Sequence, residues 1–206
     1  MTEQPRVSLV NLPNALTVLR LVLVPVFLFA LFASGGHLAS YRWLAWTIFA
    51  VAAITDRFDG HIARKRGQVT DFGKIADPMA DKALTGSALV GLSMLGNLSW
   101  WVTIVVLVRE IGITLLRFAV IRFGVISASP GGKAKTLVQI VAIGMYVLPL
   151  GPSLHWIAVW FMVAAVALTV VTGADYLVRA AALVGKAKDA RPPADQPDPT
   201  SGRGGR

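Results

Sequence analysis

Five carboxylates lie in one short stretch of the chain, residues 56–81, which reads DRFDGHIARKRGQVTDFGKIADPMAD. They make up five of the eleven acidic residues: Asp56, Asp59, Asp71, Asp77 and Asp81. Asp56 and Asp59 are three residues apart and Asp77 and Asp81 are four apart, so in helices each pair would share one face. Two such pairs brought together would repel each other, and a divalent cation bound through oxygen ligands would neutralise them.

The elements that must position these carboxylates are strongly apolar. The chain has 206 residues, of which 55% are hydrophobic and 15% charged, and its mean hydropathy is +0.63. A soluble domain carries about a quarter charged residues, so the composition predicts an all-α integral membrane protein. The apolar runs predict six transmembrane helices, at about 14–34, 41–64, 74–95, 98–122, 134–148 and 154–179. The two aspartate pairs fall at the end of the second helix and near the start of the third.

The expected organisation is a single membrane domain with two polar ends. Residues 1–13 are predicted to form a short N-terminal interfacial segment, residues 14–185 the six-helix domain with the candidate site, and residues 186–206 a disordered cytoplasmic tail without apolar periodicity. The chain has no cysteine, which excludes disulfides and thiolate metal ligands. No cleavable signal peptide is expected, because the first apolar run is long enough to span a bilayer.

The distribution of basic residues predicts the orientation. Lys and Arg gather in the connections after the second and fourth helices and in the tail, whereas the connections after the third and fifth helices have none. The positive-inside rule then places both termini, and the aspartates, on the cytoplasmic side of the inner membrane. Arg42 is an exception on the outer side. The net charge of +9 is placed to meet lipid headgroups and phosphate ligands, so no nucleic-acid partner is expected.

Small residues and an arginine accompany the carboxylates at helical spacing. Gly60 and Ala63 lie one turn beyond Asp56 and Asp59, and small residues allow a ligand to approach the backbone. Arg64 suits a phosphate, because its guanidinium can bind two oxygens. The alternative is a solvated loop between two spans. The regular spacing on both flanks argues against that alternative, since charges beside membrane spans are costly and usually functional.

Taken together, these residues resemble a known signature. The pattern Asp56-x2-Asp59-Gly60-x2-Ala63-Arg64-x8-Gly73-x3-Asp77-x3-Asp81 is similar to that of the CDP-alcohol phosphotransferases, membrane enzymes that move a phosphatidyl or similar group from a CDP-linked donor onto an alcohol and release CMP. The resemblance implies two Mg²⁺ or Mn²⁺ ions held by Asp56, Asp59, Asp77 and Asp81. It also implies that Asp81 acts as general base. The donor-binding residues it implies include Gly60, Ala63, Arg64, Thr70 and Gly73. It requires no role of His61, and Asp71 is expected to cap the third helix.

Three polar residues of the first helix, Asn14, Thr17 and Arg20, recur every three residues and share a face. One interpretation is a helix cap at Asn14 and an Arg20 that snorkels to the interface. The other is a nucleotide pocket, because the segment NLPNALTVLRLVLVP is similar to the opening of phosphatidylglycerophosphate synthases, a group within the same family. This resemblance adds Asn14 and Thr17 to the expected donor site.

Basic residues of the fourth and fifth helices are candidates for binding the acceptor. Arg109, Arg117, Lys133 and Lys135 could form a pocket for an anionic acceptor, since phosphate suits converging Arg and Lys. Alternatively, Arg109 pairs with Glu110 and the lysines only follow the positive-inside bias. The segments around them again resemble phosphatidylglycerophosphate synthases. That resemblance implies CDP-diacylglycerol as donor, glycerol 3-phosphate as acceptor, and a homodimer in the membrane lipid.

Two kinds of alternative remain open. The same chemistry could use another acceptor, either an inositol phosphate or phosphatidylglycerol, the latter giving cardiolipin. A different class of protein, a divalent-cation transporter, would also need clustered carboxylates. A transporter site is expected near the bilayer midplane between repeated halves, whereas the aspartates here lie toward one membrane face.

Overall fold

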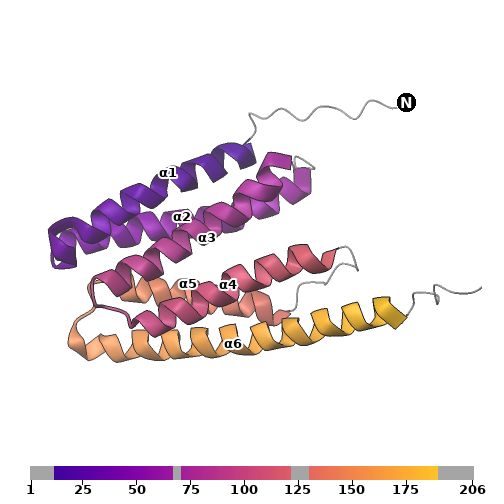
Figure 1. The fold of residues 1–206 in the computed structure, drawn as a ribbon. Helices are drawn as coiled ribbons and strands as arrows, with labels where there is room; N and C mark the ends of the chain where they lie inside the picture. Colours follow the sequence, from indigo (N-terminus) through magenta and orange to yellow (C-terminus); the bar gives the residue numbers. More distant parts are fainter. Residues whose placement is uncertain (1–11, 67–70, 122–129, 190–206) are drawn as a thin grey trace, which may run out of the picture.

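The computed structural model describes residues 12–66, 71–121 and 130–189. At 12–14, 56–66, 71–78, 81, 130 and 186–189 it describes the path of the helix and not the side chains. Within these ranges the chain forms six α-helices and no strand, with one 3₁₀ turn between the first two helices (Figure 1). The elements are α1 (Leu12–Phe32), η1 (Ala33–Gly36), α2 (Ala39–Arg66), α3 (Asp71–Met94), α4 (Trp100–Val120), α5 (Pro130–Val147) and α6 (Pro152–Asp189). The predicted all-α class and the six helices are confirmed.

The helices run alternately up and down along one bundle (Figure 1). α1, α3 and α5 begin at the same end of the bundle at which α2, α4 and α6 finish; we call this the aspartate end, because α2 ends there at Arg66 and α3 begins there at Asp71. α1 packs on α2 and α3, and α6 packs on α4 and α5. Contacts of α2 and α3 with α5, and of α3 with α4, join the two groups of helices.

The outside of the bundle is apolar, as a lipid-facing surface must be. Two described helical stretches are long and apolar enough to cross a bilayer, Ala15–Gly36 with mean hydropathy 2.5 and Pro152–Gly185 with 2.2. Large apolar side chains are exposed on all six helices, among them Phe29, Trp43, Met79, Phe118, Leu137 and Trp160. An apolar exterior of this extent is consistent with a membrane protein. Crossing by all six helices and the direction of the termini stay predictions.

Several helix boundaries differ from the sequence-based expectation, and two of them, the start of α1 and the end of α6, affect predicted features. α1 begins at Leu12, so Asn14 lies in its first turn and not in front of it. Pro13 permits this earlier start, because proline fits the first turn, where no backbone donor is needed. α6 continues to Asp189, so residues 186–189, predicted to belong to the tail, are helical. The Lys and Ala residues of this stretch are good helix formers.

The core of the bundle combines large apolar side chains with small residues that allow close helix contact. Fully buried members include Phe27, Leu31, Phe49, Leu84, Leu92 and Ile143. Gly91 of α3 shows how closely α1 approaches, because a Cβ built there would lie 2.7 Å from Cδ2 of Leu31. α1 and α3 therefore pack closely at Gly91.

Glycine ends α3 and turns the chain into α4. Gly96 has φ +73°, a conformation that side-chain-bearing residues rarely adopt. The amide of Asn97 donates to the carbonyl of Leu92 (2.9 Å) and the amide of Gly96 to that of Ser93 (3.1 Å). These two bonds form the Schellman arrangement that satisfies the last carbonyls of a helix.

Arg42 joins α2 to α5 at the opposite end of the bundle. Its Nε donates to the carbonyl of Val147 (2.8 Å), and its Nη2 donates to the carbonyls of Tyr146 (2.5 Å) and Leu148 (3.5 Å). These carbonyls end α5 and have no partner within their own helix. A buried cation is also favoured at the negative end of the helix dipole. Arg42, which is an exception to the predicted distribution of basic residues, thus has a structural role.

Replacement of Arg42 with Met tests this role. Arg42→Met keeps most of the aliphatic stem but leaves buried carbonyls without donors, so the free energy of unfolding should fall by about 2–3 kcal/mol. The readout is the thermal unfolding midpoint of the purified protein in detergent. Arg179→Met is the control, because among the described residues Arg179 pairs only with the exposed Asp175 on its own helix, and loss of this pair should cost about 0.5 kcal/mol or less. Equal midpoints for the two variants would contradict the proposed role of Arg42.

Candidate active site

The helical backbone that the aspartate pattern requires is present. Asp56 and Asp59 lie in α2 and Asp77 and Asp81 in α3, two helices that contact each other. At 1.5 Å per residue, all four backbone positions fall within about 15 Å of the aspartate end. Their side chains lie outside the described part of the structure, so a shared pocket stays a prediction. The same holds for the side chains of Asn14, Ala63 and Arg64, and Thr70 lies in the undescribed connection between α2 and α3.

The polar face of α1 is buried against these two helices. Thr17 is 1% exposed and Arg20 is 2% exposed, and both interact with other groups of the protein. An arginine that snorkelled to the interface would expose its guanidinium, so burial of Arg20 does not fit that interpretation. α1 packs on α2 and α3. Two of its three evenly spaced polar residues therefore face the interior of the bundle, as a pocket-lining role requires.

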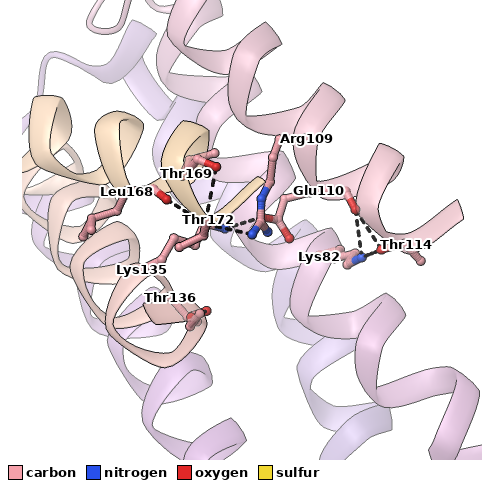
Figure 2. A network of polar contacts seen from close by, with 10 residues as sticks. Lys82, Arg109, Glu110, Thr114, Lys135, Thr136, Leu168, Thr169 and Thr172 are labelled. Atoms are coloured by element: carbon pink, nitrogen blue, oxygen red, sulfur yellow. Dashed lines mark hydrogen bonds and ion pairs between the residues drawn. The ribbon is translucent and has the colours of Figure 1, made fainter. Parts of the chain in front are cut away.

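A network of charged groups lies among α3, α4, α5 and α6, with Glu110 at its centre (Figure 2). Oε1 of Glu110 accepts a hydrogen bond from Nη1 of Arg109 (2.9 Å) and forms an ion pair with Nζ of Lys135. The Lys135 side chain is only 4% exposed, whereas those of Arg109 and Glu110 are 19% and 20% exposed. The network is thus buried on the side of α5 and partly open at α4.

Lys82 ties α3 to the same place. Its Nζ donates to the main-chain carbonyl of Glu110 (3.2 Å) and to the hydroxyl of Thr114. The Thr114 hydroxyl donates in turn to the carbonyl of Glu110 (2.7 Å). Because Lys82 directly follows Asp81, the helix that carries one aspartate pair is fixed to the helix that carries Arg109 and Glu110.

Arg109 is held on its other side by α6. Its Nη2 donates to Oγ1 of Thr172 (3.0 Å), and the Thr172 hydroxyl donates to the carbonyl of Leu168 (2.6 Å; Figure 2). Gly173 leaves room for the arginine, since a Cβ at this position would lie 3.2 Å from Cγ of Arg109. The Nε of Arg109 is buried and makes no hydrogen bond within the described part of the chain.

The charges of this network favour an anionic ligand. Lys82, Arg109 and Lys135 are cations and Glu110 is the one anion in contact with them among the described residues, so the formal charge is +2. A phosphate monoester carries about −1.5 to −2 at neutral pH. Arginine and lysine donors that converge on one point are the usual partners of such a group.

The structure brings together two of the four residues predicted for the acceptor. Arg109 and Lys135 meet at Glu110, whereas Arg117 and Lys133 are exposed and make no side-chain hydrogen bond or ion pair within residues 12–66, 71–121 and 130–189. Arg117 lies near the end of α4 and Lys133 near the start of α5, both toward the aspartate end. The pairing of Arg109 with Glu110, considered as an alternative to a pocket, is also present.

Sequence analysis missed three members of the network, Lys82, Thr114 and Thr172. For Lys82 a signal existed, because a lysine inside an apolar helix, directly after the aspartate pattern, needs a partner. The threonines gave no signal of their own, since hydroxyls in apolar helices commonly bond to the backbone one turn earlier. Thr114 and Thr172 do make those local bonds, and each in addition accepts a hydrogen bond from a cation on another helix.

Comparison with known proteins identifies the family of this chain. A family model described as CDP-alcohol phosphatidyltransferase matches residues 10–171. The chain is 62% identical over 175 residues to a probable phosphatidylglycerophosphate synthase of Mycobacterium tuberculosis, which covers 85% of this chain and 84% of that protein. It is 36% identical over 186 residues to the CDP-diacylglycerol–glycerol-3-phosphate 3-phosphatidyltransferase of Bacillus subtilis, covering 81% of this chain and 93% of that enzyme. The enzyme of the same name from Rickettsia felis is 35% identical over 179 residues, with the same coverage.

The family model spans most of the chain, including both aspartate pairs, the cationic residues around Glu110 and the polar face of α1. The relatives align over four fifths or more of the chain. This protein therefore belongs to the CDP-alcohol phosphatidyltransferase family of enzymes.

Proposed function

We propose that the protein transfers the phosphatidyl group of CDP-diacylglycerol to glycerol 3-phosphate, giving phosphatidylglycerophosphate and CMP. The observation that carries the proposal is the network around Glu110, which gathers three cations beside the helix of Asp77 and Asp81. Family membership supports the chemistry, and the names of the relatives support the two substrates. A divalent-cation transporter would not account for the family match.

For the donor, we propose that Asp56, Asp59, Asp77 and Asp81 hold two Mg²⁺ or Mn²⁺ ions. The residues fit such ions, because carboxylate oxygens are the ligands both metals prefer, and the helical backbone gives each pair the spacing of a single face on contacting helices. When bound, these ions neutralise charge at the pyrophosphate and stabilise the departing CMP. Contacts to the CDP group are assigned to residues of α1, α2, α3 and their connection: Asn14, Thr17, Gly60, Ala63, Arg64, Thr70 and Gly73.

For the acceptor, we assign the phosphate of glycerol 3-phosphate to Arg109 and Lys135. Both side chains contact Glu110, and the partial exposure of Arg109 leaves a side from which a solute can approach. The exposed Arg117 and Lys133 lie nearer the end of the bundle and would attract the anion toward this site. Glycerol 3-phosphate then arrives beside α3, whose Lys82 contacts the same network.

The transfer is proposed as a direct displacement. Asp81 takes the proton of the attacking hydroxyl as general base. The hydroxyl oxygen forms a bond to the phosphatidyl phosphorus while the pyrophosphate P–O bond breaks, and CMP leaves with that electron pair. Arg109 and Lys135 hold the other end of the acceptor so that its hydroxyl is close to the phosphorus, which reduces the entropic part of the barrier.

The setting of this reaction is proposed to be the inner membrane. The acyl chains of the donor would stay in the bilayer beside the apolar exterior, with the aspartate end at the cytoplasmic face, where Lys and Arg concentrate in the sequence. A homodimer is proposed from the family resemblance.

A CMP-release assay tests the reaction and its metal requirement. The purified protein with CDP-diacylglycerol should release CMP when glycerol 3-phosphate is added, and not with an inositol phosphate or phosphatidylglycerol. Chelation by EDTA should stop the release, and Mg²⁺ or Mn²⁺ should restore it. Asp81→Asn should lower kcat by about 10²–10⁴-fold, as loss of a general base does. Asp71→Asn is the matched control from outside the aspartate pattern and should keep near-normal activity. A preference for another acceptor would reject the assignment of glycerol 3-phosphate.

Lys135→Met tests the acceptor site. The change keeps the aliphatic stem and removes the charge, so KM for glycerol 3-phosphate should rise about tenfold or more while KM for CDP-diacylglycerol stays constant. Thr136→Ala, one position further along, is the control, because the Thr136 side chain is exposed and, within the described part of the chain, bonds only to Gly132 of its own helix. An unchanged KM for glycerol 3-phosphate in Lys135→Met would remove Lys135 from the site.

A pair of glycine variants tests whether the position of Arg109 matters. Gly173→Val forces the larger side chain against the stem of Arg109, whereas Gly112→Val adds the same atoms where no neighbour lies within 4 Å. Both glycines are inside helices, so their backbone effects are similar. KM for glycerol 3-phosphate should rise only in Gly173→Val, and that variant should be less stable by about 1–3 kcal/mol. Equal kinetics of the two variants would show that Arg109 need not be held against α6.

A further inference from the structure

We propose that Glu110 is a positioning residue of the acceptor site: its carboxylate holds Arg109 and Lys135 together so that both can donate to one phosphate group. The inference rests on the proposed function, in which Glu110 has no role of its own. It gives a role to a partly buried acid that is absent from the aspartate pattern.

The need for such a residue follows from the charges of Arg109 and Lys135. They come from different helices, α4 and α5, and approach a common point. Two cations repel strongly where water is largely excluded, and the Lys135 side chain is only 4% exposed. A single oxygen of Glu110 contacts both cations, which offsets their repulsion before any acceptor is bound.

Glu110 is itself fixed from several directions, as a positioning residue must be. Its main-chain carbonyl accepts hydrogen bonds from Lys82 on α3 and from Thr114 one turn further along α4. Arg109 is fixed on its far side by Thr172, in the space that Gly173 leaves open. The carboxylate therefore lies where α3, α4, α5 and α6 meet (Figure 2).

Glu110 orients Arg109 without exhausting its donors. A guanidinium has five N–H groups, and the bonds of Arg109 to Glu110 and Thr172 use one at Nη1 and one at Nη2. The formal charge of the network stays at +2 with Glu110 ionised, enough to balance a phosphate monoester.

A carboxylate that only competed with phosphate would weaken acceptor binding. A carboxylate that positions the cations strengthens it, so the two roles predict opposite effects of its removal.

Glu110→Gln separates these roles, because glutamine has the shape of glutamate and lacks its charge. In the purified full-length protein, KM for glycerol 3-phosphate should rise about tenfold, while kcat and KM for CDP-diacylglycerol change less than about twofold. Inorganic phosphate provides a readout that needs no turnover. The concentration at which it raises the thermal unfolding midpoint should increase by a similar factor in the variant. Asp175→Asn is the control, since it makes the same chemical change at an exposed carboxylate paired with Arg179, and both readouts should match the wild type.

A double variant distinguishes loss of the positioning role from misfolding of the single variant. Glu110→Gln alone removes the charge that contacts Lys135 at Glu110, whereas Glu110→Gln combined with Lys135→Met removes both charges of this ion pair. If Glu110 acts through Lys135, the double variant should have nearly the KM of Lys135→Met alone, and its unfolding midpoint should exceed that of Glu110→Gln. Fully additive effects on KM would show that Glu110 acts elsewhere and would overturn the inference.

Three other results would overturn it as well. They are an unchanged KM in Glu110→Gln, a lower KM, which would identify a competitor, and equal losses toward both substrates. If the wild type released no CMP with glycerol 3-phosphate, the proposed function would fail. Phosphate binding alone would then decide the inference, and equal binding by wild type and Glu110→Gln would reject it.

Discussion

A charge inside an apolar helical bundle must have a partner, and this requirement shapes the interior of the protein. Lys135 is almost completely buried and Arg109 largely so, and both contact the carboxylate of Glu110. Lys82 depends on the carbonyl of Glu110 and the hydroxyl of Thr114. Arg109 also donates to Thr172 of α6. The polar centre therefore has members on four helices and links the relative positions of α3, α4, α5 and α6. Apolar packing holds the rest of the bundle together, but it is less specific about register than a set of paired charges.

Two buried arginines show how the same requirement leads to different roles. The guanidinium of Arg42 is enclosed at one end of the bundle, where its described bonds all go to the carbonyls that end α5. That arrangement completes a helix terminus. Arg109 lies among side chains of three helices, is about one fifth exposed, and is bonded to a carboxylate and a hydroxyl that can rearrange when a ligand arrives. Partners of this kind and access from outside make Arg109 the better candidate for binding an anion.

Sequence reasoning succeeded for features that depend on the sequence of a single helix, such as its position in the chain and the residues that share a face. The bilayer requires long apolar runs, so the six helices could be counted from composition and spacing, and the spacing of Asp56 with Asp59 assigned them to one face.

Sequence reasoning was less successful for contacts between side chains of different helices. The hydrophobic periodicity of α3 does not indicate that Lys82 contacts Glu110, 28 positions later in the chain. The pairing of Arg109 with Glu110 was foreseen as an alternative to a binding pocket. The structure shows this pairing together with the contact of Lys135 to the same carboxylate, and a pocket for the acceptor stays a prediction. The predicted start of α1 and the predicted end of α6 differ from the observed ones. Pro13 and the Lys and Ala residues after Gly185 continue these helices beyond the points at which hydrophobicity alone predicts their ends.

α6 is much longer than a bilayer requires. Its 38 residues extend for about 57 Å, against a hydrocarbon core of about 30 Å, so an α6 that crosses the bilayer, as we propose, would project beyond the acyl chains even when tilted. The ion pair of Asp175 with Arg179, exposed on the last third of the helix, suits a region near headgroups or water. The same unbroken helix carries Thr172 and Gly173 beside Arg109. The contacts that hold the Arg109 guanidinium against α6 therefore belong to the same continuous helix as the turns that extend toward Asp189.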